Sequence, residues 1–172
     1  MNNTLFQNFL RFVGLLLLQV LVASHLQLGF YINPYVYPLF LMMLPFSIPQ
    51  GLLLLIGFLT GLTVDAFSNT FGIHAAACTF MIFIRPVILR LLTPKSSYEN
   101  MVQPRLHSLG YLWFFLYTGL LTFFHHLIYF FLEVFSFNNF LITLGKVLLS
   151  TSVSVLIIML MVFIFSSGRR RN

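Results

Sequence analysis

Apolar runs of about the length of a membrane span alternate with short polar stretches along the whole chain of 172 residues. A helix that crosses a bilayer needs about 20 mostly apolar residues. From this pattern we predict six spans, over residues 12–28, 35–48, 52–67, 73–92, 109–132 and 140–165. The second span is the shortest and contains Pro38 and Pro45, which should kink it, so a re-entrant segment is the alternative there.

The composition is typical of a polytopic membrane protein. The chain is 59% hydrophobic and 7% charged, whereas a soluble domain carries about 25% charged residues. The longest polar stretch, 93–108, leaves no room for a soluble domain, so we expect one all-α membrane domain over residues 1–172. Any function must then lie in the helix bundle, in its short loops or in a partner.

The start of the chain has some features of a secretory signal peptide. Arg11 precedes an apolar run that leads to Val22-Ala23-Ser24. The apolar character continues through Leu28, which is longer than the roughly 7–15 residues of a signal-peptide core. We therefore predict an uncleaved first span.

The positions of the basic residues predict the orientation of the spans. Lys and Arg are enriched in cytoplasmic loops, so Arg11, the 93–108 loop and the C-terminal tail should all be cytoplasmic. An even number of spans must then precede the loop, and both termini are cytoplasmic. The net charge of +6 therefore reflects topology, and we expect no nucleic-acid partner. The predicted cytoplasmic basic contacts, with anionic lipid headgroups among their partners, are Arg90, Lys95, Arg105, Arg169, Arg170 and Arg171.

Small residues and one carboxylate share a stripe on the third predicted span. Gly57, Gly61 and Asp65 are four residues apart and so lie on one helix face. Such a face allows two helices to approach closely and keeps the charge out of lipid. The next span begins with small residues on one side, so we predict a tight helix–helix contact whose packing residues are Gly57, Gly61, Asp65, Gly72, Ala75 and Ala76.

Charged residues within spans are costly, so pairing is favoured. Asp65 and Lys146 both lie in the predicted outer half, and we hypothesise an ion pair between them. The alternative is that Asp65 is hydrated or caps the turn while Lys146 extends to the interface. Polar stripes on the fifth and sixth spans should pack together or line a narrow wet cavity. The candidate polar network comprises Asp65, Lys146, Ser150, His126 and Glu133.

Several kinds of chemistry lack a sequence signal. His125 and His126 are adjacent and point about 100° apart on a helix, so they do not readily share one metal ion. The single cysteine, Cys78, excludes a cysteine cluster. We expect Arg85 to extend to the cytoplasmic interface. Because no nucleophile–base motif or phosphate-binding loop occurs, we expect no enzyme activity and no cofactor or metal.

One segment resembles a known family. Gly61-Leu-Thr-Val-Asp65, followed by Phe71-Gly72-Ile-His-Ala75-Ala76, is similar to the Gly-Leu-x-x-Asp and Leu-Gly-x-x-Ala elements of the rod shape-determining protein MreD. The likeness covers residues 54–79, and elsewhere it is architectural. Phe71 replaces an expected aliphatic residue, and the turn 48–50 carries no basic residue.

The resemblance implies a non-enzymatic scaffold in the bacterial cytoplasmic (inner) membrane. Such a protein couples a cytoplasmic shape filament to peptidoglycan synthesis in the elongation (rod) complex. Its implied partners are an MreC-like single-span protein, an MreB-like filament, and a RodA-type glycosyltransferase with its transpeptidase. The family fold is similar to the substrate-binding subunits of energy-coupling-factor transporters, so a vitamin-binding subunit is the alternative. In this resemblance Gly61, Asp65 and Gly72 hold the third and fourth spans together and shape an outward-facing docking site.

Overall fold

The computed structural model describes residues 2–21, 32–92, 104, 109–136 and 139–167, and all regular structure within them is helical. Four helices are long and apolar enough to cross a membrane, namely α3, α4, α7 and α8, and α1 contains a shorter apolar stretch, Asn8–Leu21. The helices are α1 (Asn2–Leu21), α2 (Pro38–Met42), α3 (Gln50–Ser68), α4 (Ile73–Leu92), α7 (Tyr111–Val134) and α8 (Phe140–Ser167).

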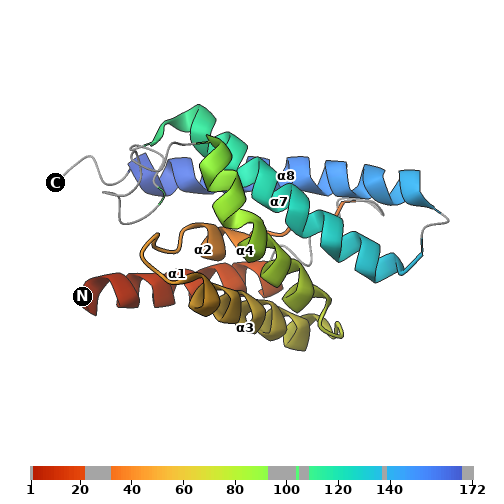
Figure 1. Cartoon of the computed structure of the whole chain (residues 1–172), viewed down its shortest axis with the longest axis horizontal. Helices are drawn as coiled ribbons and strands as arrows, with labels where there is room; N and C mark the ends of the chain where they lie inside the picture. The colour runs from red at the N-terminus through yellow and green to blue at the C-terminus, as the bar shows by residue number, and fades with distance from the viewer. Residues whose placement is uncertain (1, 22–31, 93–103, 105–108, 137–138, 168–172) are drawn as a thin grey trace.

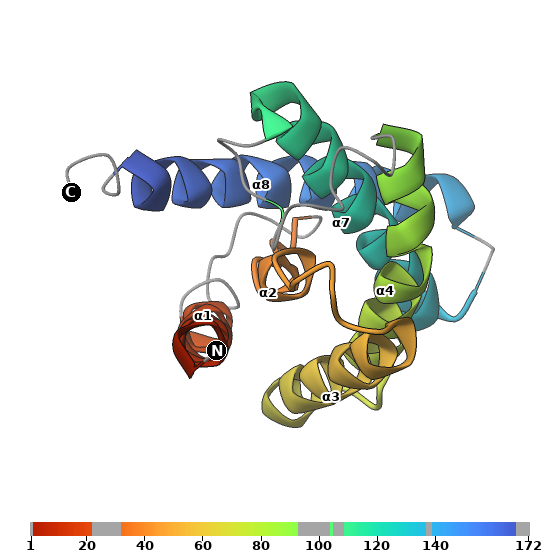
Figure 2. The same cartoon turned by 60° about the vertical axis from the view of Figure 1, so that its left-hand side comes forward.

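Two helical hairpins, α3–α4 and α7–α8, pack together through α4 and α7 (Figure 1). The starts of α1 and α3 and the end of α8 lie toward one end of the molecule, on the left of Figure 1. We call this the terminal end. The turns of both hairpins lie toward the opposite end, which we call the hairpin end. Figure 2 shows α2 between α1 and the two hairpins.

The second predicted span is not a regular helix. Only Pro38–Met42 is helical, and these five residues are all buried; at a rise of about 1.5 Å per residue they cover a small fraction of a bilayer. We call residues 32–49 the central segment. It runs from the hairpin end toward the terminal end (Figure 1). Its prolines, Pro34, Pro38, Pro45 and Pro49, prevent a longer helix because they lack the backbone donor.

Some predicted features fall outside the described residues. They are the end of the first span (22–28), the 93–108 loop apart from Pro104, and the basic residues Lys95, Arg105, Arg169, Arg170 and Arg171.

Close approach of α3 and α4 depends on Gly61, as the sequence stripe predicted. A Cβ atom added there would lie 2.4 Å from both Ala75 Cα and His74 O. At Gly57 an added Cβ would meet Ile82 Cγ1 at 3.1 Å. Ala75 is buried at this contact. Gly72 has a φ of +81°, a conformation that glycine adopts without strain, and it ends the turn between the helices.

A side chain at the start of α3 repairs a gap in the hydrogen bonds of α4. Pro86 lies inside α4 and has no N–H to donate to the carbonyl of Ile82, four residues earlier. The side chain of Gln50 donates to that carbonyl, at 2.9 Å. The turn 48–50, whose contacts the sequence did not predict, is therefore joined to the middle of α4.

Candidate functional site

Non-helical backbone at membrane depth needs hydrogen-bond partners from its surroundings, and the central segment receives them from side chains of several helices. On α1, Gln19 donates to Pro34 O at 3.3 Å and accepts from Val36 N at 2.8 Å. On α8, Ser150 accepts from Asn33 N at 3.1 Å, and Ser154 accepts from Tyr35 N at 2.9 Å. These contacts hold the start of the segment.

Arg85 holds the other end of the segment. Its guanidinium donates to Leu44 O at 2.6 Å and to Tyr117 Oη at 2.8 Å. Tyr117 in turn donates to Met42 O at 3.0 Å. Arg85 is only 2% exposed, so the expectation that it extends to the interface is wrong. The free carbonyls at the end of α2 attract the cation, and snorkelling would leave them unpaired.

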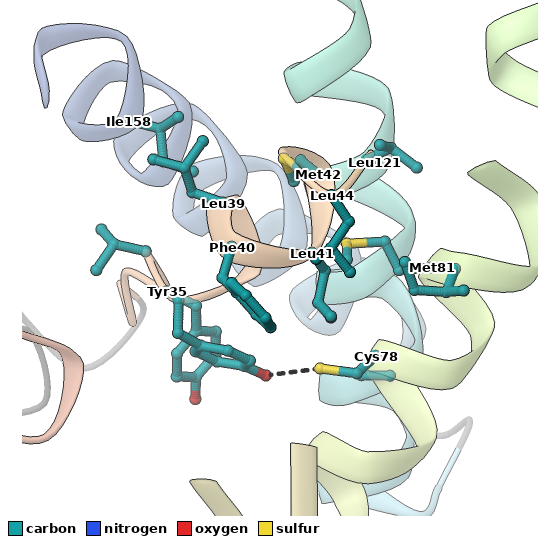
Figure 3. Close-up of a cluster of buried hydrophobic side chains, with 14 of the residues drawn as sticks. Tyr35, Leu39, Phe40, Leu41, Met42, Leu44, Cys78, Met81, Leu121 and Ile158 are labelled. Atoms are coloured by element: carbon teal, nitrogen blue, oxygen red, sulfur yellow. Dashed lines mark hydrogen bonds between the residues drawn. The ribbon is translucent and has the colours of Figure 1, made fainter. Parts of the chain in front are cut away.

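The middle of the segment is anchored through Tyr37. Its hydroxyl lies 3.0 Å from His74 Nδ1 and 2.7 Å from His125 Nε2. The thiol of Cys78 donates to the same oxygen at 3.4 Å, the dashed line of Figure 3. Side chains from α4 and α7 thus converge on one phenol, and all four residues are buried.

The tautomer of a third buried histidine, His126, follows from its hydrogen-bond partners. His126 Nδ1 lies 2.8 Å from Thr122 O, and a carbonyl only accepts, so Nδ1 carries the proton. Nε2 is then bare and accepts from the Ser154 hydroxyl, 3.2 Å away. The sequence showed no such serine–histidine pair. Both residues are fully buried and Ser154 already accepts from Tyr35 N, so the pair holds the backbone in place.

Asp65 caps the start of α4. Its carboxylate accepts from His74 N at 3.1 Å and from Ala75 N at 2.9 Å, and Thr70 also donates to it. These N–H groups have no partner within α4 because they belong to its first turn. The hypothesised Asp65–Lys146 ion pair is therefore wrong, and the capping alternative describes Asp65.

Lys146 pairs instead with Glu133. The Nζ–Oε2 distance is 3.2 Å, and the side chains are 20% and 33% exposed. Tyr129 donates to the other oxygen of Glu133 at 3.4 Å. The predicted polar network is therefore divided among separate groups, because Asp65 bonds to α4 while Ser150 and His126 support the central segment.

Two further predicted residues lie at the surface. Ala76 is exposed and does not pack between α3 and α4 as predicted. Arg90 is also exposed, and its Nε donates to Pro86 O at 3.2 Å. Ala76 lies in an open hollow of about 590 Å³ on the outer surface of the α3–α4 hairpin, lined by small and apolar side chains: Leu54, Phe58, Leu62, Gly72, Ala75, Ala76, Thr79, Phe80 and Phe83.

Among the described residues, no group of three or more His, Cys, Asp or Glu side chains is arranged to hold a metal ion. The fold and its buried polar groups define an all-helical protein with four helices able to span a membrane. Comparison with protein-family models, curated proteins and solved structures finds no match to the chain.

Proposed function

We propose that this protein is a non-enzymatic membrane scaffold of the bacterial elongation machinery, of the MreD type. It would join a single-span MreC-like protein to the RodA-type glycosyltransferase and its transpeptidase, and to an MreB-like filament in the cytoplasm. The proposal places it in the bacterial inner membrane with six crossings, one of them made by the central segment.

One observation carries the proposal: the motif residues meet in a single structural unit. Gly61 allows α3 to touch α4, Gly72 turns the chain, and Asp65 caps α4. The α3–α4 hairpin is thereby fixed as a rigid element. Its open hollow has the small residues Gly72, Ala76 and Thr79 among larger Leu and Phe side chains, and small residues are typical of the surfaces on which membrane helices pack.

The vitamin-binding alternative is less well supported. A ligand subunit needs a concave pocket, commonly several hundred Å³ in volume. Here the space between the helices holds the central segment, whose side chains Tyr35, Tyr37, Leu41 and Met42 are buried. Figure 3 shows the labelled side chains of this segment among those of Cys78, Met81, Leu121 and Ile158 from the surrounding helices.

Depletion in the native host tests the scaffold. We expect cells to round up and wall synthesis to lose its normal placement. Complementation by Gly61→Val, at the helix contact, should fail, whereas Gly119→Ala, where an added Cβ meets nothing within 4 Å, should restore shape. Membrane levels of both variants must be compared, because loss of folding would mimic loss of function. An auxotrophy cured by one vitamin would instead support the transporter reading.

Partner contact can be tested by photo-crosslinking. Benzoylphenylalanine at Phe83, in the hollow, should capture a single-span wall-synthesis protein. The same group at Leu141, which is exposed on α8, is the matched control. Equal capture at both positions would argue against the hollow as the docking site.

A further inference from the structure

We propose that Tyr37, His74 and His125 form a proton-operated latch on the central segment. The proposal is independent of the scaffold function. It rests on how many protons one phenol oxygen can share with the groups that surround it.

The tyrosine hydroxyl has one proton to donate and two lone pairs that accept. Cys78 donates to this oxygen, which uses one lone pair. Tyr37 must then donate to one histidine and accept from the other, because both ring nitrogens lie within 3.0 Å of the oxygen. One of the two facing nitrogens is therefore bare while the latch is closed.

Adding a proton to that unprotonated ring nitrogen removes the only group that can accept the hydroxyl proton of Tyr37. Three donors would then compete for two lone pairs, and the hydroxyl proton of Tyr37 would point at an N–H group. The ring that donates to Tyr37 can also carry a proton on its second nitrogen without breaking the latch. The latch fails when both rings are doubly protonated. His125 Nδ1 is already buried with no hydrogen-bond partner, so a proton there would gain no compensating bond.

A polar line connects the latch to the hairpin end. Glu133 is part-exposed and bonds to Tyr129, whose ring packs edge-on against that of Tyr35 with centroids 4.9 Å apart. Tyr35 contacts the ring of His74 edge-on, with centroids 5.0 Å apart. Toward the terminal end, the fixed positive charge of Arg85 opposes the passage of protons. The latch should therefore respond to pH at the hairpin end.

One nearby carboxylate attracts a proton to the latch, while burial of the rings opposes their protonation as long as the latch is closed. Asp65 on α3 accepts from the backbone of His74, which brings a negative charge close to that histidine. Lys146 on α8 is neutralised by Glu133 on α7. The remaining titratable or charged groups of the described elements around the latch are Arg85 and Cys78 on α4, Tyr117, His126 and Tyr129 on α7, and Tyr35 on the central segment. From α1 comes the neutral Gln19.

Cys78 provides the test, because it is the single cysteine and is fully buried against the latch. Its maleimide labelling rate is measured in the purified full-length protein between about pH 7.5 and 5, the range in which histidine titrates. Each rate is divided by that of the same protein unfolded at the same pH, which cancels thiol ionisation. We expect the normalised rate to rise about tenfold per pH unit for each proton that opening takes up.

Variants test whether the latch causes the pH dependence of Cys78 labelling. His74→Asn and His125→Gln place an amide where each facing ring nitrogen stood but do not titrate, so the double variant should label independently of pH. His126→Gln removes a buried histidine that bonds to Ser154 and not to Tyr37, so its labelling should still rise on acidification, whatever its rate at pH 7.5. A flat wild-type profile, an undiminished response in the double variant, or its loss in His126→Gln alone would overturn the proposal.

A second measurement needs no variant. Deuterium exchange of the amides of Asn33, Tyr35 and Val36, which bond to side chains of α8 and α1, is followed in the wild-type protein. After correction for the intrinsic pH dependence of exchange, protection should fall with the same midpoint as the labelling of Cys78. Protection that stays constant across that range would refute the latch even if the double variant did not fold.

Discussion

Single side chains decide how closely α3 and α4 can pack. Gly61 lies against backbone atoms of α4, which cannot rotate away as a flexible side chain would. Asp65, one turn later on α3, accepts the N–H groups at the start of α4. Steric fit and capping therefore act on the same pair of helices within one helical turn.

Gly61→Ala should force the two helices apart. Its new Cβ would lie 2.4 Å from Ala75 Cα, and overpacking of this kind costs about 1–3 kcal/mol. We expect a lower melting temperature for the detergent-purified protein. Gly119→Ala is the matched control, since its Cβ meets open space and alanine is the better helix former by up to about 1 kcal/mol. An unchanged melting temperature in Gly61→Ala would contradict the close contact.

Asp65→Ala should destabilise the start of α4. Two buried N–H groups would lose their acceptor, and each unsatisfied group costs about 1–3 kcal/mol. Asp65→Asn retains one carbonyl oxygen and should fall between wild type and Asp65→Ala in thermal unfolding. Lys146→Met should leave this ranking unchanged, because Lys146 pairs with Glu133. Non-additive effects of the substitutions at positions 65 and 146 would instead indicate an ion pair between them.

At the scale of helices, two elements depend on side chains that repair broken backbone patterns. Gln50 replaces the donor that Pro86 removes from α4. Arg85 and Tyr117 replace the donors that the end of α2 lacks. In both cases a proline-bearing element is fixed by a residue distant in sequence.

Gln50→Leu should destabilise α4 by about 1 kcal/mol, the usual contribution of one hydrogen bond. In the Pro86→Ala background a backbone N–H can serve Ile82 O, so the same substitution should have little effect. The double-mutant cycle in thermal unfolding therefore measures the repair directly. Additive effects would mean that Gln50 does not serve this carbonyl.

Arg85→Leu should loosen the terminal end of the central segment. Trp113, the single tryptophan, stacks on Tyr117 with centroids 4.8 Å apart and reports this change by its fluorescence. Arg85→Lys should rescue only in part, because lysine cannot reproduce the planar array of donors. Arg90→Leu, an exposed arginine on the same helix, should leave the spectrum unchanged; an equal shift there would indicate a general loss of structure.

The sequence predicted α3, α4, α7 and α8 well because their apolar runs are long and uniform. The first predicted span, 12–28, overlaps α1 only in part, because α1 begins at Asn2. The sequence also predicted the α3–α4 contact, because glycines spaced by four residues lie on one helix face and allow a neighbouring helix to pack closely. It did not predict the central segment or the role of Arg85. A short proline-rich run matches several structures equally well, and its polar partners lie on α1, α4, α7 and α8, where spacing within one helix carries no information about contacts between helices.

At the scale of the whole molecule, the central segment links the two ends of the bundle (Figure 1). If this segment crosses the membrane, both hairpin turns face one side, and the start of α1 and the end of α8 face the other. In the described part of the chain four helices reach span length, and the location of both termini on one side of the membrane stays a prediction from charge placement.

Cysteine labelling tests this arrangement in intact cells. In a Cys78→Ser background, Phe71→Cys and Phe135→Cys, both highly exposed at the hairpin turns, should react with a membrane-impermeant maleimide added outside. Leu91→Cys, at the end of α4, should react only after the membrane is opened. Labelling of Leu91→Cys and Phe71→Cys from the same side would rule out a crossing by α4.

The bonds from Ser150 to Asn33 and from Ser154 to Tyr35 join residues 117 and 119 positions apart. During synthesis the start of the central segment is therefore made long before the serines that complete its backbone hydrogen bonds. If the segment lies at membrane depth, its unpaired peptide groups cannot remain in lipid alone. Until then this part of the chain needs water or another protein to satisfy its peptide groups. It takes its final position only after α8 has left the ribosome.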